Sequence, residues 1–275
     1  MSKISTAVIP VAGFGTRFLP VAKSVPKELL PILDRPLLQI LVEEIVAAGI
    51  TKIVFVVSSG KEAIRNHFSP APALEKKLAA SGQQKLLTEI QKISQLADFE
   101  FVEQVEMLGD GHAILQAQTK VTDDNFLVVF GDELIFGEPS KELLSVFNAK
   151  QSAVVGLQKV APTELENFGV VAVDSDFAIQ KFVEKPKPEE APSDLAIVGK
   201  YIVPQKIFNI LKQHPSASGE IRLIDALAIL AQTEKVFGKV LTGKRFDCGQ
   251  AAGWLAANFF AAEADPQIAK ALKKN

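Results

Sequence analysis

The chain has 275 residues, of which 48% are hydrophobic and 23% charged, so it can bury a sizeable core. This composition excludes disordered, collagen-like and coiled-coil proteins. Thirty Lys and Arg residues against 32 Asp and Glu residues give a formal charge of −2, which provides no overall attraction for nucleic acid or an anionic membrane.

The first half of the chain alternates short β-branched runs with longer amphipathic stretches, as βαβ units do. The predicted strands are 7–11, 53–57, 99–102 and 126–130, and the predicted helices are 37–48, 62–67 and 113–119, with a further helical region at 69–95. Because residues 54–57 and 127–130 are continuously apolar, these strands are expected to be buried on both faces of a parallel sheet.

Strands dominate the second half until residue 202. The predicted strands are 153–158, 170–173, 179–183 and 195–202, with a strand-like run at 239–242, and the predicted helices are 141–148, 205–212, 223–232 and 253–264. Strands that follow one another without long helices predict an antiparallel or mixed lobe set onto the parallel part. No linker rich in Gly, Ser or Pro separates the halves, so we expect a single two-lobed α/β domain over residues 1–275.

A glycine-containing loop follows the first predicted strand, with the sequence Ala12-Gly13-Phe14-Gly15-Thr16-Arg17. Glycines let backbone N–H groups approach phosphate oxygens, and Arg17 adds a bidentate donor. The loop differs from the dinucleotide fingerprint because Phe18 replaces the third glycine, and it lacks the Gly-Lys-Ser/Thr of a Walker loop. A plain βα turn is the alternative, and the nearby Lys27 favours the phosphate-binding interpretation.

Two aspartates follow predicted strands, where ligands gather at the carboxyl edge of an α/β sheet. Asp132 comes after the strand 126–130, and Asp247 precedes the last predicted helix. Two carboxylates suit Mg²⁺, which takes one or two of them together with substrate phosphates and water. Either aspartate could instead be a helix N-cap or a turn residue.

The loop, extended through Pro26-Lys27-Glu28, resembles the signature of the sugar-nucleotide pyrophosphorylases. Further blocks follow in the order of that family: Gln104 with Gly109-Asp110-Gly111-His112-Ala113, Gly131-Asp132, Phe168-Gly169-Val170-Val171, Val183-Glu184-Lys185-Pro186, Ile197-Val198-Gly199-Lys200-Tyr201 and Phe246-Asp247-Cys248-Gly249. The similarity covers nearly the whole chain. It is strongest to the bacterial members that form UDP-glucose.

The resemblance implies a Rossmann-like, mixed but mainly parallel sheet flanked by helices, with a smaller β-rich sugar-binding lobe. The nucleotide-binding lobe would span mainly residues 1–135, the sugar-phosphate-binding lobe mainly 136–250 and a C-terminal helix 251–275. The implied activity joins UTP to glucose 1-phosphate by in-line attack on the α-phosphate, which releases pyrophosphate. Such a reaction needs positioning and charge neutralisation and no covalent enzyme intermediate.

The resemblance also implies the roles of individual residues. The catalytic cations would be Arg17, Lys27 and Lys185. The nucleotide would contact Ala12, Gly13, Gly15, Thr16, Glu28, Gln104 and Gly109, with Gln104 offering an acceptor and a donor to the uracil edge. The sugar would contact Gly169, Glu184, Gly199 and Lys200, and Mg²⁺ would bind Asp132 and Asp247. Taken alone, Gln104 could be a solvent-facing residue, Glu184-Lys185 a surface ion pair and Lys200 an ordinary exposed lysine.

Several positions depart from the pattern of the uridylyltransferases. Leu108 and Asp110 stand where a Lys and a Leu are usual, Gly131-Asp132-Glu133 replaces a strand end of the Pro-Asp-Asp type, and Ile224 replaces a Thr. A dTTP-dependent enzyme, or one for another hexose 1-phosphate, therefore remains an alternative. A non-catalytic homologue that binds a sugar nucleotide is an alternative of another class.

The single cysteine, Cys248, cannot form an internal disulfide or a cysteine-based zinc site, and this favours a reducing compartment. The N-terminus does not resemble a signal peptide, and no apolar run reaches the length of a spanning helix. We expect a cytoplasmic protein without nucleic-acid or membrane partners. Members of the family are usually homo-oligomers, and the apolar run 254–260 could supply an interface or pack on its own sheet.

Overall fold

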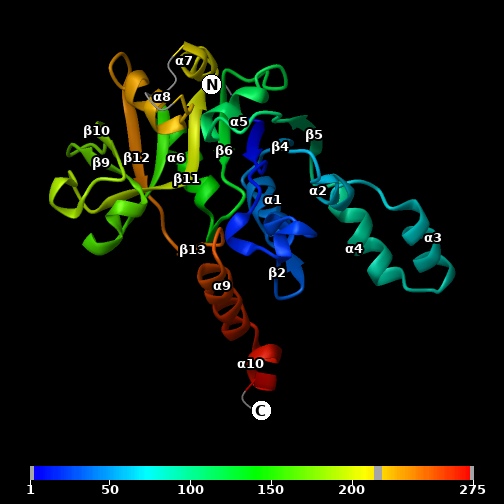
Figure 1. The fold of residues 1–275 in the computed structure, drawn as a ribbon. Coiled ribbons are helices and arrows are strands. Elements are labelled where there is room, and N and C mark those ends of the chain that lie inside the picture. The colour runs from blue at the N-terminus through cyan, green and yellow to red at the C-terminus, as the bar shows by residue number, and fades with distance from the viewer. Residues whose placement is uncertain (1–2, 214–218, 273–275) are drawn as a thin grey trace.

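The computed structural model describes residues 3–213 and 219–272 and shows a central sheet between layers of helices (Figure 1). The strands are β1 (Thr6–Pro10), β2 (Pro31–Ile32), β3 (Arg35–Pro36), β4 (Lys52–Val57), β5 (Asp98–Glu103), β6 (Asn125–Val129), β7 (Glu133–Phe136), β8 (Ala153–Lys159), β9 (Gly169–Val173), β10 (Ile179–Glu184), β11 (Leu195–Pro204), β12 (Val236–Val240) and β13 (Lys244–Asp247). The helices are α1 (Leu37–Ala47), α2 (Glu62–His67), α3 (Pro72–Ala80), α4 (Gln84–Ser94), α5 (Asp110–Gln116), α6 (Pro139–Lys150), α7 (Ile207–Gln213), α8 (Leu223–Leu230), α9 (Ala251–Ala264) and α10 (Pro266–Leu272).

The main sheet has nine strands, in the order β10-β9-β11-β6-β1-β4-β5, with β8 and β12 branching from β11. The neighbours β6, β1, β4 and β5 run parallel, so their carboxyl ends meet at one edge. The long strand β11 pairs antiparallel with β6, β8 and β9, with a register shift between Ile197 and Tyr201 in its pairing with β8. A parallel part and a mainly antiparallel part therefore share one continuous sheet, which confirms the predicted fold class.

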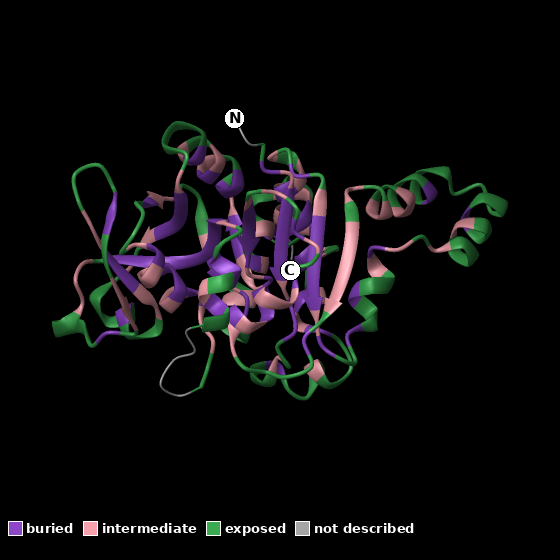
Figure 2. Ribbon diagram, turned by 90° about the horizontal axis from the view of Figure 1, so that it is seen from above, coloured by how far each residue is buried: buried purple, intermediate pink, exposed green. Residues whose placement is uncertain are grey.

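Alternation along the strands explains why helices cover both faces of the sheet. In β4, Ile53 and Phe55 pack into one apolar cluster with α1 and α6, whereas Val54 and Val56 pack into the other with α5, α7 and α8. Each cluster is apolar because consecutive side chains of a strand point to opposite faces. Figure 2 shows the resulting band of buried residues through the middle of the molecule.

A short ribbon outside the main sheet brings two distant segments together. Strand β13 pairs antiparallel with β7, which places Asp247 opposite Glu133 and Phe246 opposite Leu134. The ribbon was not predicted, and the strand expected at 239–242 is instead β12, which ends at Val240. The ribbon matters for the site because Asp132 immediately precedes β7.

Two helical segments project from the body (Figure 1). The helical region predicted at 69–95 is a pair, α3 and α4, which the chain connects through Gly82 at a φ of 71°. Helix α9 extends away from β13 towards α10 and exposes Leu255, Phe259 and Phe260. In the described part of the chain, no helix has both the length and the apolar character needed to cross a membrane.

Candidate active site

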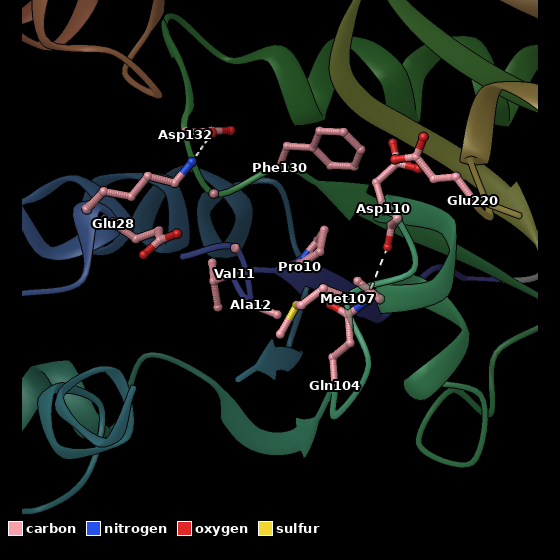
Figure 3. Close-up of a pocket in the computed structure, with 15 residues that line it drawn as sticks. Pro10, Val11, Ala12, Glu28, Gln104, Met107, Asp110, Phe130, Asp132 and Glu220 are labelled. Atoms are coloured by element: carbon pink, nitrogen blue, oxygen red, sulfur yellow. Dashed lines mark hydrogen bonds and ion pairs between the residues drawn. The ribbon is translucent and has the colours of Figure 1, made fainter. Parts of the chain in front are cut away.

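The carboxyl ends of the parallel strands surround a cavity of about 320 Å³, a size suited to a small ligand (Figure 3). Its walls come from the segments after β1, β5 and β6, from the loop before α5 and from residues 27 and 28. It is lined by Pro10, Val11, Ala12, Gly13, Lys27, Glu28, Gln104, Met107, Gly109, Asp110, Ala113, Phe130, Gly131, Asp132 and Glu220. This first cavity brings together Ala12, Gly13, Glu28, Gln104 and Gly109, which the sequence assigned to the nucleotide.

A lysine and an aspartate meet at one end of the first cavity. Lys27 Nζ donates to Asp132 Oδ2 at 2.5 Å. Burial opposes the charge on Lys27, but Asp132 and Glu28 outweigh it and raise the pKa of the ammonium group. Lys27 therefore carries a fixed positive charge beside the carboxylate, as a site for phosphate requires.

A second lysine, Lys61, binds two residues that line the first cavity, Glu28 and Val11. It was not among the predicted site residues. Its Nζ donates to both carboxylate oxygens of Glu28, at 2.9 and 3.0 Å, and to the carbonyl oxygen of Val11. Lys61 is 8% exposed and Glu28 only 1%. Burial raises the pKa of Glu28 and lowers that of Lys61, while each charge stabilises the other. The position of Lys61 in the sequence could have identified it as a site residue, because it follows β4 at the same carboxyl edge of the sheet as the glycine-containing loop.

Gln104 lies at another side of the first cavity, where β5 ends (Figure 3). Its backbone N–H continues the sheet by donating to Val57 O at 2.8 Å. Its side chain is buried, and Nε2 lies 3.2 Å from Gly109 O and 3.1 Å from His112 Nδ1. The alternative of a solvent-facing glutamine is therefore wrong.

The ribbon of β7 and β13 brings Asp247 next to Asp132. A β-carbon on Gly249 would lie 2.8 Å from Asp132 Oδ2 and 2.9 Å from Asp247 Oδ1, so both carboxylates converge on this glycine. Cys248 N donates to Asp132 O at 2.8 Å and fixes the two segments together. Two converging carboxylates, of which Asp132 lines the first cavity, fit Mg²⁺ when substrate oxygens and water complete its ligands. They are too few to enclose a cation alone, and no cluster of three or more such ligands occurs in the described ranges.

The neighbouring Glu133 has a different partner. Arg245 donates to both of its carboxylate oxygens at 2.6 Å, in the bidentate geometry of a strong ion pair. Burial raises the pKa of Glu133 although Arg245 opposes this shift. Glu133 therefore stabilises the ribbon through its ion pair with Arg245. Burial also raises the pKa of the Cys248 thiol, which lies in the same ribbon region, to about 12, and a protonated thiol is unreactive.

A second cavity, of about 150 Å³, adjoins the first on the antiparallel side of the sheet. It is lined by Asp110, Phe130, Glu133, Asn167, Phe168, Gly169, Glu184, Ile197, Gly199, Tyr201, Arg222 and Ile224. The predicted sugar-binding residues Gly169, Glu184 and Gly199 thus lie together. Asp110 and Phe130 belong to both linings, so the two cavities meet at these residues.

Lys185 directly follows the end of β10. Its φ is 45°, in the left-handed region that non-glycine residues rarely adopt, and its N–H donates to Phe168 O at 3.0 Å. The turn breaks the alternation of the strand after Glu184. Lys185 is exposed at the rim of the second cavity rather than in its lining.

Six predicted residues lie outside both linings, and two of them, Lys185 and Asp247, are described above. Gly15, Thr16 and Arg17 belong to the loop beyond the first cavity, where the side chains of Thr16 and Arg17 are exposed.

The predicted role of Lys200 in binding the sugar is wrong. It is fully buried, with Nζ 3.6 Å from Glu44 Oε2 of α1. Because Gly199 and Tyr201 line the second cavity, alternation directs Lys200 to the opposite face of β11, and it cannot contact a sugar there.

This geometry agrees with the comparisons with known proteins. The family model described as nucleotidyl transferase matches residues 6–264. The chain belongs to the nucleotidyl transferase family. The resemblance found in its sequence motifs is thereby confirmed.

Similar members of the family match over nearly the whole of both chains and share the fold. The chain is 39% identical to UTP–glucose-1-phosphate uridylyltransferase of Pseudomonas aeruginosa, over 94% of this chain and 96% of that protein. A UTP-bound UGPase from Acinetobacter baumannii superposes with a TM-score of 0.93 at 36% identity and covers 99% of this chain and 98% of the other. A UDP-glucose pyrophosphorylase complexed with UDP-glucose gives 0.85 at 33% identity, over 96% and 100%.

Proposed function

We propose that this member of the nucleotidyl transferase family forms UDP-glucose and pyrophosphate from UTP and glucose 1-phosphate. The observation that carries the proposal is the pair of adjoining cavities that share Asp110 and Phe130. The first cavity offers the buried amide of Gln104 and the ammonium group of Lys27 beside a carboxylate, and the second is lined by Glu184, Gly169 and Gly199. The similar proteins bind UTP or UDP-glucose, as their names state.

In this proposal, the nucleotide occupies the first cavity. Because Gln104 Nε2 donates to Gly109 O, its Oε1 remains to accept from the N3–H of uracil. The small residues Ala12 and Gly13 let the nucleoside approach the backbone, and the triphosphate extends past Lys27 towards the loop with Gly15, Thr16 and Arg17. Lys27 and Arg17 then stabilise the charge of the departing pyrophosphate.

Glucose 1-phosphate occupies the second cavity. Glu184 accepts hydrogen bonds from sugar hydroxyls, and Gly169 and Gly199 leave room for the ring. Lys185, at the rim, directs the phosphate towards Lys27 and Asp132 in the first cavity. A phosphate oxygen of the sugar attacks the α-phosphorus of UTP in line as the bond to pyrophosphate breaks.

Asp132 and Asp247 are the residues that would hold Mg²⁺. When bound, the ion neutralises charge on the α-phosphate. Lys27 occupies Asp132 Oδ2 in this structure, so both a lysine and a metal would share that carboxylate when substrate binds. We therefore propose that turnover requires a divalent cation.

The proposal also covers the domain organisation of the protein, its location in the cell and its association with further copies of itself. The chain would act as a single domain, because one sheet continues from the first cavity to the second. It would work in the cytoplasm and associate with further copies of itself, with the exposed apolar residues of α9 as the candidate contact. None of these three features changes the assignment of the two cavities.

A panel of substrates tests the proposed function. The purified protein is incubated with UTP, dTTP, ATP, CTP or GTP and with the 1-phosphates of glucose, galactose, mannose or N-acetylglucosamine, with Mg²⁺ or EDTA, and pyrophosphate release is measured. We expect the highest kcat/KM for UTP with glucose 1-phosphate and no turnover in EDTA. A higher kcat/KM for dTTP or another hexose would replace the substrates, and binding of UDP-glucose without turnover would favour a regulatory protein.

A further inference from the structure

Asp110 sits at the start of α5, and the chain around it is fixed. Gly109 has a φ of 111°, and a β-carbon there would lie 2.4 Å from Ile221 O, so the loop presses directly against the segment before α8. Asp110 Oδ1 accepts from Gly111 N at 2.6 Å and from Leu223 N at 3.0 Å. These two bonds hold the carboxylate in one orientation.

The other carboxylate oxygen is free to bind a ligand. Asp110 lines both cavities, and among the described residues no hydrogen-bond donor reaches its Oδ2. An ionised carboxylate can accept further hydrogen bonds at that oxygen. The side chain is therefore an anchored acceptor at the boundary between the two cavities.

The charges around Asp110 restrict what it can bind. Glu184 and Glu220 both disfavour its charged form, and Arg222, the nearby cation of the second cavity, is already paired with Asp225 at 2.8 and 3.2 Å. A phosphate would be repelled by this group of carboxylates. A neutral hydroxyl can instead donate to Oδ2 and compensate for the water lost on burial.

We infer that Asp110 is a specificity-determining residue that accepts a hydrogen bond from a sugar hydroxyl at the junction of the two cavities. The inference rests on the proposed function and deepens it. The hydroxyl belongs either to the ribose of the nucleotide or to the hexose, since Asp110 faces both cavities. In each case the same chemistry applies: a neutral donor pairs with a fixed carboxylate oxygen.

Deoxy substrates identify the hydroxyl. The kcat/KM of the wild-type protein and of Asp110→Ala is measured with 2′-deoxy- and 3′-deoxy-UTP, and with glucose 1-phosphates lacking the 2-, 3-, 4- or 6-hydroxyl. We expect one analogue to be used roughly 10- to 100-fold less well by the wild-type protein, as befits the loss of a bond to a charged acceptor. The penalty is the kcat/KM with the parent substrate divided by the kcat/KM with the analogue. In Asp110→Ala the penalty for that one analogue should fall to about threefold or less, while the penalties for the other analogues stay as in the wild-type protein.

Two further variants make the result decisive. Asp110→Asn keeps Oδ1 for the backbone bonds and replaces only the free oxygen, so it gives the same comparison if Asp110→Ala does not fold. Asp174→Asn is the control, because Asp174 Oδ1 also accepts from two backbone N–H groups but lies far along the chain, outside both linings. It should show wild-type penalties throughout. Identical penalties in the wild-type protein and the Asp110 variants would overturn the inference, whereas a wild-type protein inactive with UTP and glucose 1-phosphate would overturn the proposed function instead.

Discussion

Lys61 and Glu28 form a buried ion pair behind the first cavity, where each charge depends on the other. Removing one partner of such a pair leaves an uncompensated charge and costs about 3–5 kcal/mol. We therefore expect Lys61→Met to lower the free energy of unfolding by about that amount and to raise the KM for UTP more than it lowers kcat. Urea denaturation and steady-state kinetics measure the two effects.

Lys52, at the start of the strand that Lys61 follows, provides the matched control for Lys61. Lys52 pairs with Glu100 at 2.7 Å, but both side chains are partly exposed. Because water screens such a pair, Lys52→Met should cost less than about 1 kcal/mol and leave the KM for UTP unchanged. Equal losses of stability in the two variants would contradict a special role for the Lys61–Glu28 pair.

The pH dependence of stability tests the environment of Asp110. Burial raises the pKa of its carboxyl from 3.8 to about 6, although the N–H groups of Leu223 and Gly111 oppose the shift. The folded protein then binds a proton that the unfolded chain has released, so stability falls as the pH rises from about 4 to about 6 and stays lower above that.

Asp110→Asn removes this penalty. We expect the variant to be more stable than the wild-type protein by roughly 1–3 kcal/mol at pH 7.5 and to differ much less at pH 4.5. Urea denaturation at the two pH values measures the difference. If the free energies of unfolding of Asp110→Asn and the wild-type protein differed by the same amount at both pH values, the raised pKa of Asp110 would be contradicted.

The sequence motifs predicted many of the residues that line the cavities, and several of these residues stand where a strand ends. Gln104 follows β5, Asp132 follows β6 and Glu184 is the last residue of β10. Lys61 escaped prediction because a lysine before a short helix has the same local sequence whether it is exposed or buried. The error at Lys200 has the same origin, since only the pairing of β11 shows which face of the strand a residue occupies.

At the level of elements, the ribbon of β7 and β13 places the two aspartates. Gly249 has no room for a methyl group between Asp132 and Asp247. We expect Gly249→Ala to push the carboxylates apart, to lower kcat/KM roughly 10²-fold and to raise the Mg²⁺ concentration needed for half-maximal activity. Steady-state kinetics over a range of Mg²⁺ concentrations measure both changes.

Gly137, which directly follows β7, is the control for Gly249. A β-carbon there would meet its nearest neighbour, Thr242 O, at an ordinary 3.4 Å. Gly137→Ala should therefore keep near wild-type kinetics. An unchanged Mg²⁺ requirement in Gly249→Ala would separate the two aspartates from metal binding.

The elements differ in how readily the sequence predicts them. Strands β1, β4 and β6 were predicted to within one residue at each end, because they are buried on both faces and continuously apolar. The ribbon strands β7 and β13 are only four residues each and mix charged with apolar residues. Their pairing joins residues more than 100 positions apart, and local sequence carries no signal for it.

At the scale of the whole molecule, β6 and β11 connect the two cavities. Phe130, which follows β6, donates its backbone N–H to Gly199 O at 2.7 Å, so a wall of the first cavity is bonded directly to a wall of the second. In our proposal one continuous sheet therefore positions both substrates, and one product molecule should span the junction.

A crystal structure of the protein with UDP-glucose tests this claim most directly. We expect the uracil against Gln104 in the first cavity, the glucose against Glu184 in the second, and the diphosphate between them beside Lys27 and Asp132. UDP-glucose bound with its hexose outside the second cavity, or with its base away from Gln104, would contradict the account.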